Sequence, residues 1–492
     1  MADSLDADSL DADSLDRVLA AAAAAAHEVA AVPLKARAAW LRAIADDLEA
    51  AKDELIALAQ TETHLPVARL TGEVGRTSFQ LRLTADAVVE GSWLELTVDH
   101  ADPDWPTGPR PDLRRWLRPV GPVLVVAASN FPFAFSVAGG DTASALGAGC
   151  PVILKAHPGH RELSTRTAAL VGAALQRAGA PAGTFALIEG EADTQTALRD
   201  PRVKAASFTG SVRGGRALFD IASTRPDPIP FYGELGSVNP AFVLPSAIAE
   251  RRTETLEGFV ASFTMGVGQF CTKPGILFVP RTPDLIDELA ALVGGVGGSQ
   301  LLNERIGDGF AGRLDDMRGR WSLIQEGDGG PEGVTPTLFS TSLENATTAL
   351  DALWEESFGP TAVVVEYDDP ADLVGVARLL PGQLTATVHA DEDDPTAQPL
   401  LSVLAGHAGR IVWNGWPTGV SVSWAMQHGG SWPATTASLH TSVGPTALRR
   451  FVQPVAYQNV PASLLPTLLQ EQDASVWRRV DGALTAPAPV DG

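Results

Sequence analysis

Cysteine is scarce in this chain, and its two cysteines, among 492 residues, stand in contrasting surroundings. Cys271 lies between glycines and a Pro-Gly pair, in the sequence GVGQFCTKPG of residues 266–275. A thiol on such a polar loop can ionise and be reached by a substrate. Cys150 heads an apolar run, which is typical of an inert thiol in the core. Cys271 is therefore a candidate nucleophile, against the commoner role of a lone cysteine in packing.

Two polar side chains directly follow segments that are predicted to be buried strands. Asn130 comes after the apolar run 123–128 and precedes Phe131. It is either a turn residue, the commoner role beside a proline-containing loop, or an amide donor aimed at a developing oxyanion. Lys155 leaves the strand predicted at 151–154, and lysine occurs at only five positions in the chain. Its ammonium either reaches back to water or holds a ligand oxygen at the carboxyl edge of the sheet.

Two later segments also carry groups that suit chemistry. In ASFTGSVRGG, residues 206–215, a strand runs into a turn at Gly210 and Ser211 and then into a helix. Free amides and the helix dipole there suit a phosphate, although a tight turn uses the same residues and the segment lacks the G-x-G-x-x-G fingerprint. Glu234 stands between glycines in YGELGSVNP, residues 232–240. It is either a solvated loop carboxylate or a general base with a raised pKa near the thiol.

Strands that alternate with helices must position these groups. Helical spacing of apolar residues starts at Pro33 and continues to about 58, a second helix is predicted at 71–89, and 91–111 is predicted to be a loop or excursion. Four strands follow, at 123–128, 151–154, 184–188 and 205–208. Their alternation with helices favours a parallel, doubly wound α/β sheet. A second block, about 240–439, has strands near 276–279, 361–365, 385–389 and 410–413, and a helix with long surface loops over 307–333.

The length, about three times that of a typical domain, predicts two or three domains. A net charge of −23 disfavours non-specific binding to nucleic acid or to an anionic membrane. Two cysteines give no disulfide framework, so we expect a cytoplasmic protein. The acidic repeat of residues 1–16 predicts a frayed tail without the cationic start of a signal peptide, and no transmembrane segment is predicted.

Six motifs in order give the chain, from about Ala36 to Ala456, a resemblance to the NAD(P)-dependent aldehyde dehydrogenase superfamily. They are SNFPF at 129–133, KAHP at 155–158, FTGS at 208–211, ELGS at 234–237, GQFCT at 268–272 and EESFGP at 355–360. Within the superfamily the chain is similar to the branch of 2-oxoglutarate semialdehyde dehydrogenases and related NADP-preferring fatty-aldehyde enzymes. The segments that carry this likeness are FYGELGSVNP at 231–240, CTKPG at 271–275, NGWPTGV at 414–420 and HGGSWPAT at 428–435. The last departs from the commoner ending P-F-G-G-x-K-x-S-G.

The resemblance implies a covalent mechanism. Cys271 would attack the aldehyde carbon to give a thiohemiacetal, whose oxyanion the Asn130 amide and the Cys271 backbone N–H would stabilise. Hydride transfer to the nicotinamide would leave a thioester, and Glu234 would activate the water that hydrolyses it. The cofactor-binding residues that the resemblance implies are Ser129, Lys155, His157, Pro158, Gly210, Ser211, Glu356 and Phe358. Among them Lys155 would bind the adenosine ribose, Glu356 the nicotinamide ribose, and Phe358 would pack near the nicotinamide ring.

The position of Pro158 bears on cofactor choice. NAD-preferring members often place a glutamate three residues after the lysine, and here that residue is Pro158, so no carboxylate there repels a 2′-phosphate. Lys155, with His157 or Arg161, would attract that phosphate. We therefore expect NADP to be the cofactor, with NAD tolerated.

The substrate is open between two kinds of aldehyde. A dicarboxylate semialdehyde needs cations at the pocket mouth, for which Arg449, Arg450 or an unplaced arginine are candidates. A fatty aldehyde needs an apolar funnel, for which the candidates are Phe131, Phe133, Phe270, Trp416 and Trp424. The branch resemblance favours 2-oxoglutarate semialdehyde. A catalytically inactive binding protein is disfavoured by the complete set of catalytic residues, and a CoA-acylating enzyme by Glu234, because that branch needs no water-activating base.

The expected architecture follows the same family. A low-complexity tail at 1–16 precedes a Rossmann-type cofactor domain at 17–90 and 119–232, and an α/β catalytic domain spans 233–440. Residues 91–118 and 441–492 would form a small β oligomerisation element with a C-terminal tail, and the family implies homodimers or homotetramers.

Overall fold

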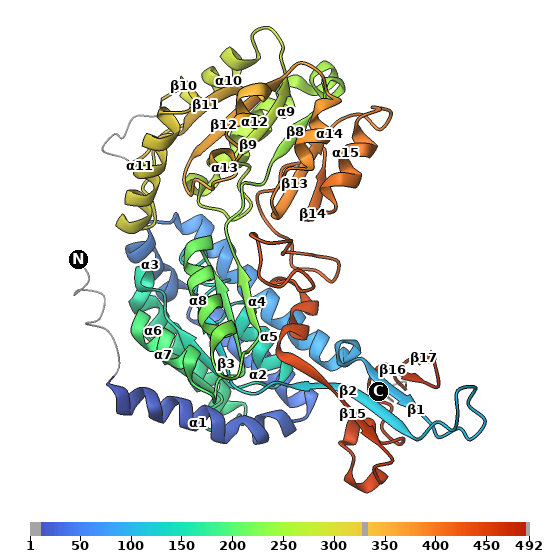
Figure 1. Cartoon of the computed structure of the whole chain (residues 1–492). Helices are drawn as coiled ribbons and strands as arrows, with labels where there is room; N and C mark the ends of the chain where they lie inside the picture. The colour runs from blue at the N-terminus through green and yellow to red at the C-terminus, as the bar shows by residue number, and fades with distance from the viewer. Residues whose placement is uncertain (1–10, 327–332, 489–492) are drawn as a thin grey trace.

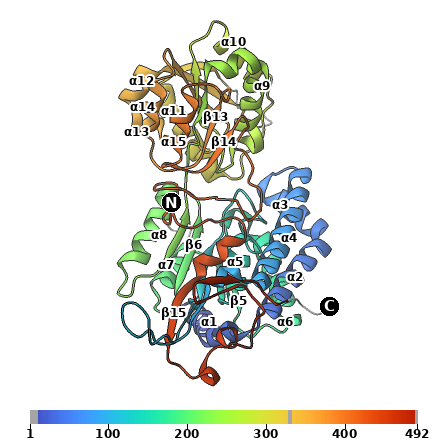
Figure 2. The ribbon, with the colours of Figure 1, turned by 90° about the vertical axis from the view of Figure 1, so that its right-hand side faces the viewer.

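The computed structural model describes residues 11–326 and 333–488. Its strands form three sheets, two of which lie in two stacked lobes (Figure 1). The third sheet projects to one side of the lower lobe, and Figure 2 shows the narrow region where the two lobes meet. The α/β class with parallel sheets that was predicted from the sequence is confirmed.

The lower lobe is built on five parallel strands in the order β5-β4-β3-β6-β7. Their bounds are β3 Val123–Val126, β4 Val152–Lys155, β5 Phe185–Ile188, β6 Ala205–Thr209 and β7 Phe231–Glu234. Every residue of β3 and β4 is buried, as expected for apolar strands covered by helices on both faces. The order reverses between β3 and β6, which is where a doubly wound sheet opens a ligand crevice at its carboxyl edge.

Helices on both faces of this sheet bury its core. They are α1 Ala12–Ala31, α2 Leu34–Ala50, α3 Lys52–Thr63, α4 Val67–Glu90, α5 Gly140–Ala148, α6 Arg161–Arg177, α7 Glu191–Arg199, α8 Val212–Thr224 and the short η2 Pro158–His160. The continuous helix expected from Pro33 to about 58 is two helices, α2 and α3, with Ala51 between them. Cys150, at the head of β4, is buried, and burial raises the pKa of its thiol to about 11.

The predicted tail of residues 1–16 is partly wrong. Helix α1 begins at Ala12, because the Asp11 carboxylate caps it by accepting a hydrogen bond of 2.7 Å from the Ser14 N–H. Leu15 and Leu19 then bury their side chains against the sheet, which compensates for ordering these residues. The remainder of the predicted tail, residues 1–10, lies outside the described residues.

The upper lobe is built on seven strands in the order β10-β11-β12-β9-β8-β13-β14, parallel except for the antiparallel edge strand β10. Their bounds are β8 Ala241–Val243, β9 Ile276–Pro280, β10 Ser322–Gln325, β11 Thr337–Ser342, β12 Thr361–Tyr367, β13 Gln383–His389 and β14 Ala408–Trp413. The helices are α9 Pro245–Thr264, η3 Met265–Gly268, α10 Leu285–Gly294, α11 Glu304–Arg318, α12 Leu343–Thr348, α13 Leu350–Leu353, α14 Asp372–Ala377 and α15 Ala397–Leu404. Of the segment expected to be a helix with long loops, 307–333, residues 327–332 lie outside the description.

Chain segments far apart in the sequence meet in the third sheet, whose order is β15-β2-β1-β16-β17. Its strands are β1 Leu96–Asp99, β2 Leu113–Pro119, β15 Val452–Gln458, β16 Arg478–Val480 and β17 Ala483–Thr485, with the short helices η1 Ser92–Leu94, η4 Pro445–Phe451, η5 Ala462–Leu464 and η6 Thr467–Leu469. The two segments assigned to one small element, 91–118 and 441–492, thus share one sheet. Strand β7, however, runs through the domain boundary placed after residue 232 and carries Glu234 as part of the lower sheet.

No single described helix is long and apolar enough to cross a membrane. The helices α1 and α2 meet the length and composition test only as a joined pair, which is bent by 120°.

Candidate active site

Cys271 follows a tight break in the chain after α9. Gly266, Val267 and Gly268 have φ values of 58°, 57° and 66°, so three consecutive residues adopt left-handed backbone. Glycine is required at 268, because a Cβ there would lie 2.1 Å from the Gly359 carbonyl oxygen. After the break Cys271 is half-buried, with its Sγ within 4.8 Å of Glu234 on β7 of the lower sheet.

The loop of Cys271 is anchored by one buried side chain, that of Asn239. Its Nδ2 donates to the carbonyl oxygens of Cys271 at 2.8 Å and Lys273 at 3.0 Å. Its Oδ1 accepts from the backbone N–H and the hydroxyl of Thr385, on β13, at 3.2 and 3.0 Å. Gln383, also on β13, accepts a hydrogen bond of 3.0 Å from the Asn239 N–H. The loop of the nucleophile is therefore fixed to a central strand of the upper sheet.

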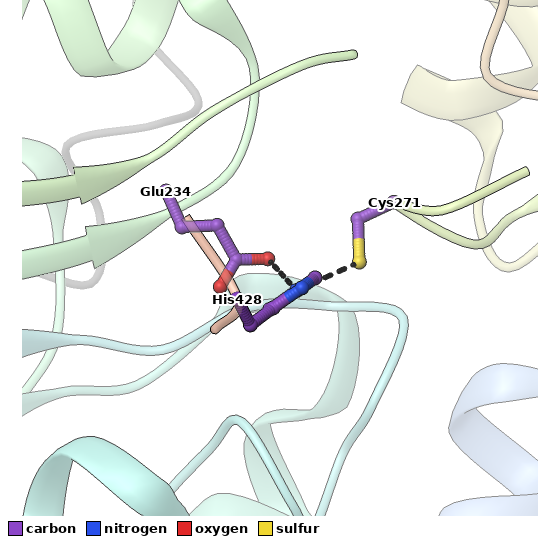
Figure 3. Close-up of side chains that lie close together, drawn as sticks. All are labelled: Glu234, Cys271 and His428. Atoms are coloured by element: carbon purple, nitrogen blue, oxygen red, sulfur yellow. Dashed lines mark hydrogen bonds and ion pairs between the residues drawn. The ribbon is translucent and has the colours of Figure 1, made fainter. Parts of the chain in front are cut away.

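Glu234, His428 and Cys271 converge at this place (Figure 3). His428 Nε2 lies 2.8 Å from Glu234 Oε1 and 3.5 Å from Cys271 Sγ. Ser442 donates a short hydrogen bond to the other oxygen of Glu234. Glu234 and His428 are 4% and 1% exposed, so this polar cluster is sealed from bulk water. One imidazole nitrogen thus lies between the carboxylate and the thiol.

The charges of the cluster are set by burial and by this contact. Burial, and then the negative charge of Glu234, hold the pKa of Cys271 well above its usual range. Burial also acts to raise the pKa of Glu234, but the charge of His428 and hydrogen bonds from His428 and Ser442 outweigh it and lower that pKa. The expectation of a raised pKa for Glu234 is therefore wrong, and burial also contradicts the alternative of a solvated loop carboxylate. Its role as a general base stays a prediction. The resting pair is an ionised carboxylate and a neutral thiol.

Asn130 lies on the other side of the nucleophile loop. It follows β3, is buried, and its Nδ2 donates to the Gln269 carbonyl oxygen at 3.1 Å. An amide nitrogen carries two N–H groups, and this bond uses only one of them. Arg69, on α4, fixes the Asn130 backbone by donating to its carbonyl oxygen at 2.8 Å.

Comparison with known proteins identifies the class of this site. A model of the aldehyde dehydrogenase family matches residues 4–295. The chain is 45% identical over 460 residues to alpha-ketoglutaric semialdehyde dehydrogenase 2 of Azospirillum brasilense, covering 90% of this chain and 86% of that one. It is 42% identical over 459 residues to the alpha-ketoglutaric semialdehyde dehydrogenase of Acinetobacter baylyi, covering 91% and 87%.

This chain belongs to the aldehyde dehydrogenase family. It is an oxidoreductase that acts on aldehydes and uses NAD(P). The fold is also that of NADP-dependent glyceraldehyde-3-phosphate dehydrogenase from Bacillus halodurans, with a TM-score of 0.78 at 21% identity and 92% of each chain covered.

The carboxyl edge of the lower sheet in this aldehyde dehydrogenase fits a dinucleotide. Lys155 ends β4, is 7% exposed, and its ammonium forms no salt bridge or hydrogen bond with any residue that the structure describes. A buried cation of this kind suits an anionic ligand. Gly210 and Ser211 are exposed at the start of the 13-residue helix α8, where free backbone amides suit a phosphate.

The residues around Lys155 differ in the positive charge that they offer to a 2′-phosphate. The expectation that His157 or Arg161 adds to the attraction is not met. Burial, and then the charges of His160 and Lys155, lower the pKa of His157 well below its usual range, so the imidazole is neutral. Arg161 forms a salt bridge of 2.6 Å with Glu189. Pro158 is exposed at the first position of η2 and presents no charge.

The segment 355–360, which contains Glu356 and Phe358, is joined to the nucleophile loop by Lys273. The Lys273 ammonium donates to the carbonyl oxygens of Ser357 at 2.6 Å, Gly359 at 3.1 Å and Thr361 at 2.8 Å. Glu356 is beside it, and burial raises the pKa of the Glu356 carboxyl, while Lys273 acts to lower it. Glu356 and Phe358 are half-buried, and the charge of Glu356 also acts to raise the pKa of Cys271, after burial and Glu234. Ser129, half-buried, directly precedes Asn130 at the end of β3.

Most of the side chains expected to bind the far end of the substrate lie elsewhere. Arg449 is exposed and pairs with Glu95, and Arg450 pairs with Asp141 at 2.7 Å. Trp416 packs on Phe259 and His389 in the upper lobe, and Trp424 is 45% exposed. Phe133 is buried, whereas Phe131 and Phe270 do meet beside the nucleophile, with ring centroids 5.2 Å apart.

Sequence reasoning missed three residues that the site depends on, namely His428, Asn239 and Lys273. Each falls inside a motif already quoted for the branch resemblance, so the signal was present without a role attached. Their partners are 32 to 194 residues away along the chain, and no local pattern predicts such contacts.

Replacing Asn239 by Leu removes the anchor of the nucleophile loop. We expect the free energy of unfolding to fall by about 2–5 kcal/mol, because buried carbonyl oxygens lose their donors. Alkylation of Cys271 by iodoacetamide should also change in rate, since the loop loses its fixed geometry. Urea unfolding and mass spectrometry of the alkylated protein measure both. Asn345→Leu, on an exposed turn of α12, is the matched control; wild-type stability and alkylation in the Asn239 variant would contradict the anchoring role.

Replacing Glu234 by Gln removes the negative charge that opposes the thiolate. The midpoint of the pH dependence of Cys271 alkylation should therefore move to lower pH, by about one unit. Cys271→Ala identifies the modified residue, because the remaining thiol, Cys150, is buried. An unchanged or higher midpoint would show that Glu234 does not govern the thiol.

Proposed function

We propose that this enzyme oxidises 2-oxoglutarate semialdehyde to 2-oxoglutarate through a thioester on Cys271. The observation that carries the chemistry is the contact of His428 Nε2 with both Glu234 and Cys271, at 2.8 and 3.5 Å. The choice of substrate is supported by identities of 45% and 42% to two proteins named for that activity, each over nine-tenths of this chain.

The first step is activation of the neutral thiol. The Cys271 proton passes to the Glu234 carboxylate, which lies within 4.8 Å of Sγ. His428 Nε2–H donates a hydrogen bond to that carboxylate and holds it in place. Sγ then attacks the aldehyde carbon, a carbon–sulfur bond forms, and the carbonyl oxygen becomes an oxyanion. The free N–H of the Asn130 amide and the backbone N–H of Cys271 stabilise that charge.

Lys155, Gly210, Ser211 and Glu356 are the residues that would hold NAD(P), with Ser129 and Phe358 beside them. When bound, the nicotinamide accepts the hydride from the substrate carbon. Glu234 then releases the proton taken from Cys271 to solvent. Water cleaves the thioester by giving a proton to the Glu234 carboxylate while its oxygen bonds to the carbonyl carbon. The carbon–sulfur bond then breaks, and the sulfur leaves as the thiolate and regains a proton from the cluster.

We infer that NADP is preferred and NAD tolerated. The support is electrostatic: Pro158 stands where a carboxylate would repel a 2′-phosphate, and Lys155 is a buried cation beside it. With His157 neutral and Arg161 paired to Glu189, Lys155 carries this preference alone among the three.

A second substrate class, fatty aldehydes, is favoured by one observation. The rings of Phe131, Phe135 and Phe270 form an apolar wall beside the nucleophile. The ring centroid of Phe131 lies 5.4 Å from that of Phe135 and 5.2 Å from that of Phe270.

We propose further that the third sheet joins copies of this chain into a homodimer or homotetramer. It projects from the body, and its edge strand β17 is exposed at every residue.

The direct test measures absorbance of the reduced nicotinamide with 2-oxoglutarate semialdehyde, with NADP and NAD in parallel. Rapid reduction, with 2-oxoglutarate as the product, is expected for the wild type, and loss of at least about 1,000-fold in kcat for Cys271→Ala. Cys150→Ala is the matched control and should retain activity, because that thiol is buried in the core. Activity on long-chain aldehydes but not on 2-oxoglutarate semialdehyde would show that fatty aldehydes are the substrate class.

Replacing Pro158 by Glu introduces the missing carboxylate. We expect kcat/KM with NADP to fall about 10-fold or more, since a like charge within a few ångströms of the 2′-phosphate is repelled, with little change for NAD. Pro158→Gln has a similar side-chain shape without the charge and separates electrostatics from loss of the proline. Equal losses with both cofactors in the Glu variant would contradict the assigned position of the 2′-phosphate.

A further inference from the structure

Two arginines of α4 border the aromatic residues beside the nucleophile. The guanidinium carbon of Arg69 lies 4.7 Å from the ring centroid of Phe131 and 4.8 Å from that of Phe270. The guanidinium carbon of Arg76 lies 5.3 Å from the ring centroid of Phe135. Since Phe131 follows Asn130 and Phe270 precedes Cys271, both cations are close to the reacting groups. The apolar wall is therefore also a positively charged one.

The guanidinium groups of Arg69 and Arg76 have one carboxylate on the same helix as their counter-charge, that of Glu73. Its Oε1 accepts from the backbone N–H groups of Phe133 at 2.8 Å and Ala134 at 3.0 Å. Its Oε2 is 3.7 Å from Arg69 Nη2, in the only salt bridge that either arginine forms within the described residues. Two half-buried arginines share this one carboxylate, so one positive charge is left without a salt bridge among the described residues.

Hydrogen bonding distinguishes the two arginines. Arg69 donates to the Asn130 carbonyl oxygen at 2.8 Å, and its Nη1 is buried without a partner among the described residues. Arg76 makes one long contact, 3.5 Å from Nη2 to the Val420 carbonyl oxygen, and its Nη1 is buried without a partner among the described residues. By contrast, Arg37, a buried structural arginine, donates three hydrogen bonds of 2.6 to 2.9 Å to carbonyl oxygens. Arg76 therefore keeps donors for a ligand.

The position of Arg76 suits the far end of the proposed substrate. The carboxylate of 2-oxoglutarate semialdehyde is four carbon–carbon bonds from the aldehyde carbon, about 5 Å in an extended chain. The Arg76 guanidinium carbon lies 5.9 Å from the ring centroid of Phe131, which packs on Phe270 beside the nucleophile. Burial lowers the pKa of Arg76, and the negative charges of Glu73 and Glu234 act to raise it. A carboxylate there would replace the weak contact to Val420 by charge-assisted hydrogen bonds.

We propose that Arg76, with Arg69 beside it, binds the substrate carboxylate and selects aldehydes that carry an acid group at the far end. The identity of that acid rests on the proposed function, but the subsite itself is a property of these side chains. It also assigns a role to α4, a helix with no residue in the catalytic cluster.

The test compares two aldehydes of equal chain length, glutarate semialdehyde and pentanal. In the wild type the acid should be preferred. In Arg76→Leu, kcat/KM for glutarate semialdehyde should fall roughly 10- to 100-fold, the range for loss of a charged hydrogen bond, with most of the change in KM. The value for pentanal should stay within about threefold. Competitive inhibition by glutarate should weaken in parallel.

Matched variants control for folding and charge. Arg82→Leu removes an arginine from the same helix, where Arg82 binds Asp46 and Glu49 at the surface, and should leave both substrates unchanged. Arg76→Lys keeps the charge without the planar fork and should recover part of the preference. If the Leu variant does not fold, Arg76→Lys and Arg76→Gln are compared with the same substrates and inhibitor.

Two results would overturn the subsite: no preference for glutarate semialdehyde in the wild type, or equal losses on both aldehydes in the Arg76 variants. A preference for acidic aldehydes without activity on 2-oxoglutarate semialdehyde would instead retain the subsite and refute the proposed substrate.

Discussion

The hydrogen bonds of the Asn239 amide are the constraint on which the arrangement of the active site depends. The side chain uses its two N–H groups and its carbonyl oxygen to join the nucleophile loop, at Cys271 and Lys273, to Thr385 of a central strand. Asn239 itself has a φ of 49°, a left-handed conformation that asparagine tolerates better than most residues. It lies five residues after Glu234, so one short segment of chain sets both the acid of the lower sheet and the loop of the nucleophile.

His428 Nε2 contacts both Glu234 and Cys271, and this shared contact governs the electrostatics of the cluster. A buried carboxylate beside a buried thiol is unfavourable for two negative charges, which is why the thiol rests in its neutral form. His428 holds the Glu234 carboxylate beside the thiol, because its Nε2 contacts both partners. In a water-poor environment this single contact is worth more than it would be at the surface.

Local sequence patterns predicted the parts of the molecule whose structure is decided locally. The runs at 123–128, 151–154 and 361–365 are strands because continuous apolar side chains need cover on both faces. The order of motifs led to Cys271, Glu234 and Asn130 before any contact was known. The pKa direction of Glu234 was not predictable, since it depends on His428 and Ser442, which reach the site from 194 and 208 residues away. Arg76 was hidden for a similar reason: on its helix it is one of several arginines, and only tertiary packing shows that its donors are unused.

The three members of the catalytic cluster come from three different parts of the chain path. Glu234 ends the last strand of the lower sheet, Cys271 follows the first long helix of the upper lobe, and His428 lies on the segment that returns from the upper lobe to the lower one. Neither lobe contains the cluster by itself. The geometry of the cluster therefore depends on how the two lobes are docked, and a rotation between them would separate its members while each lobe stays folded.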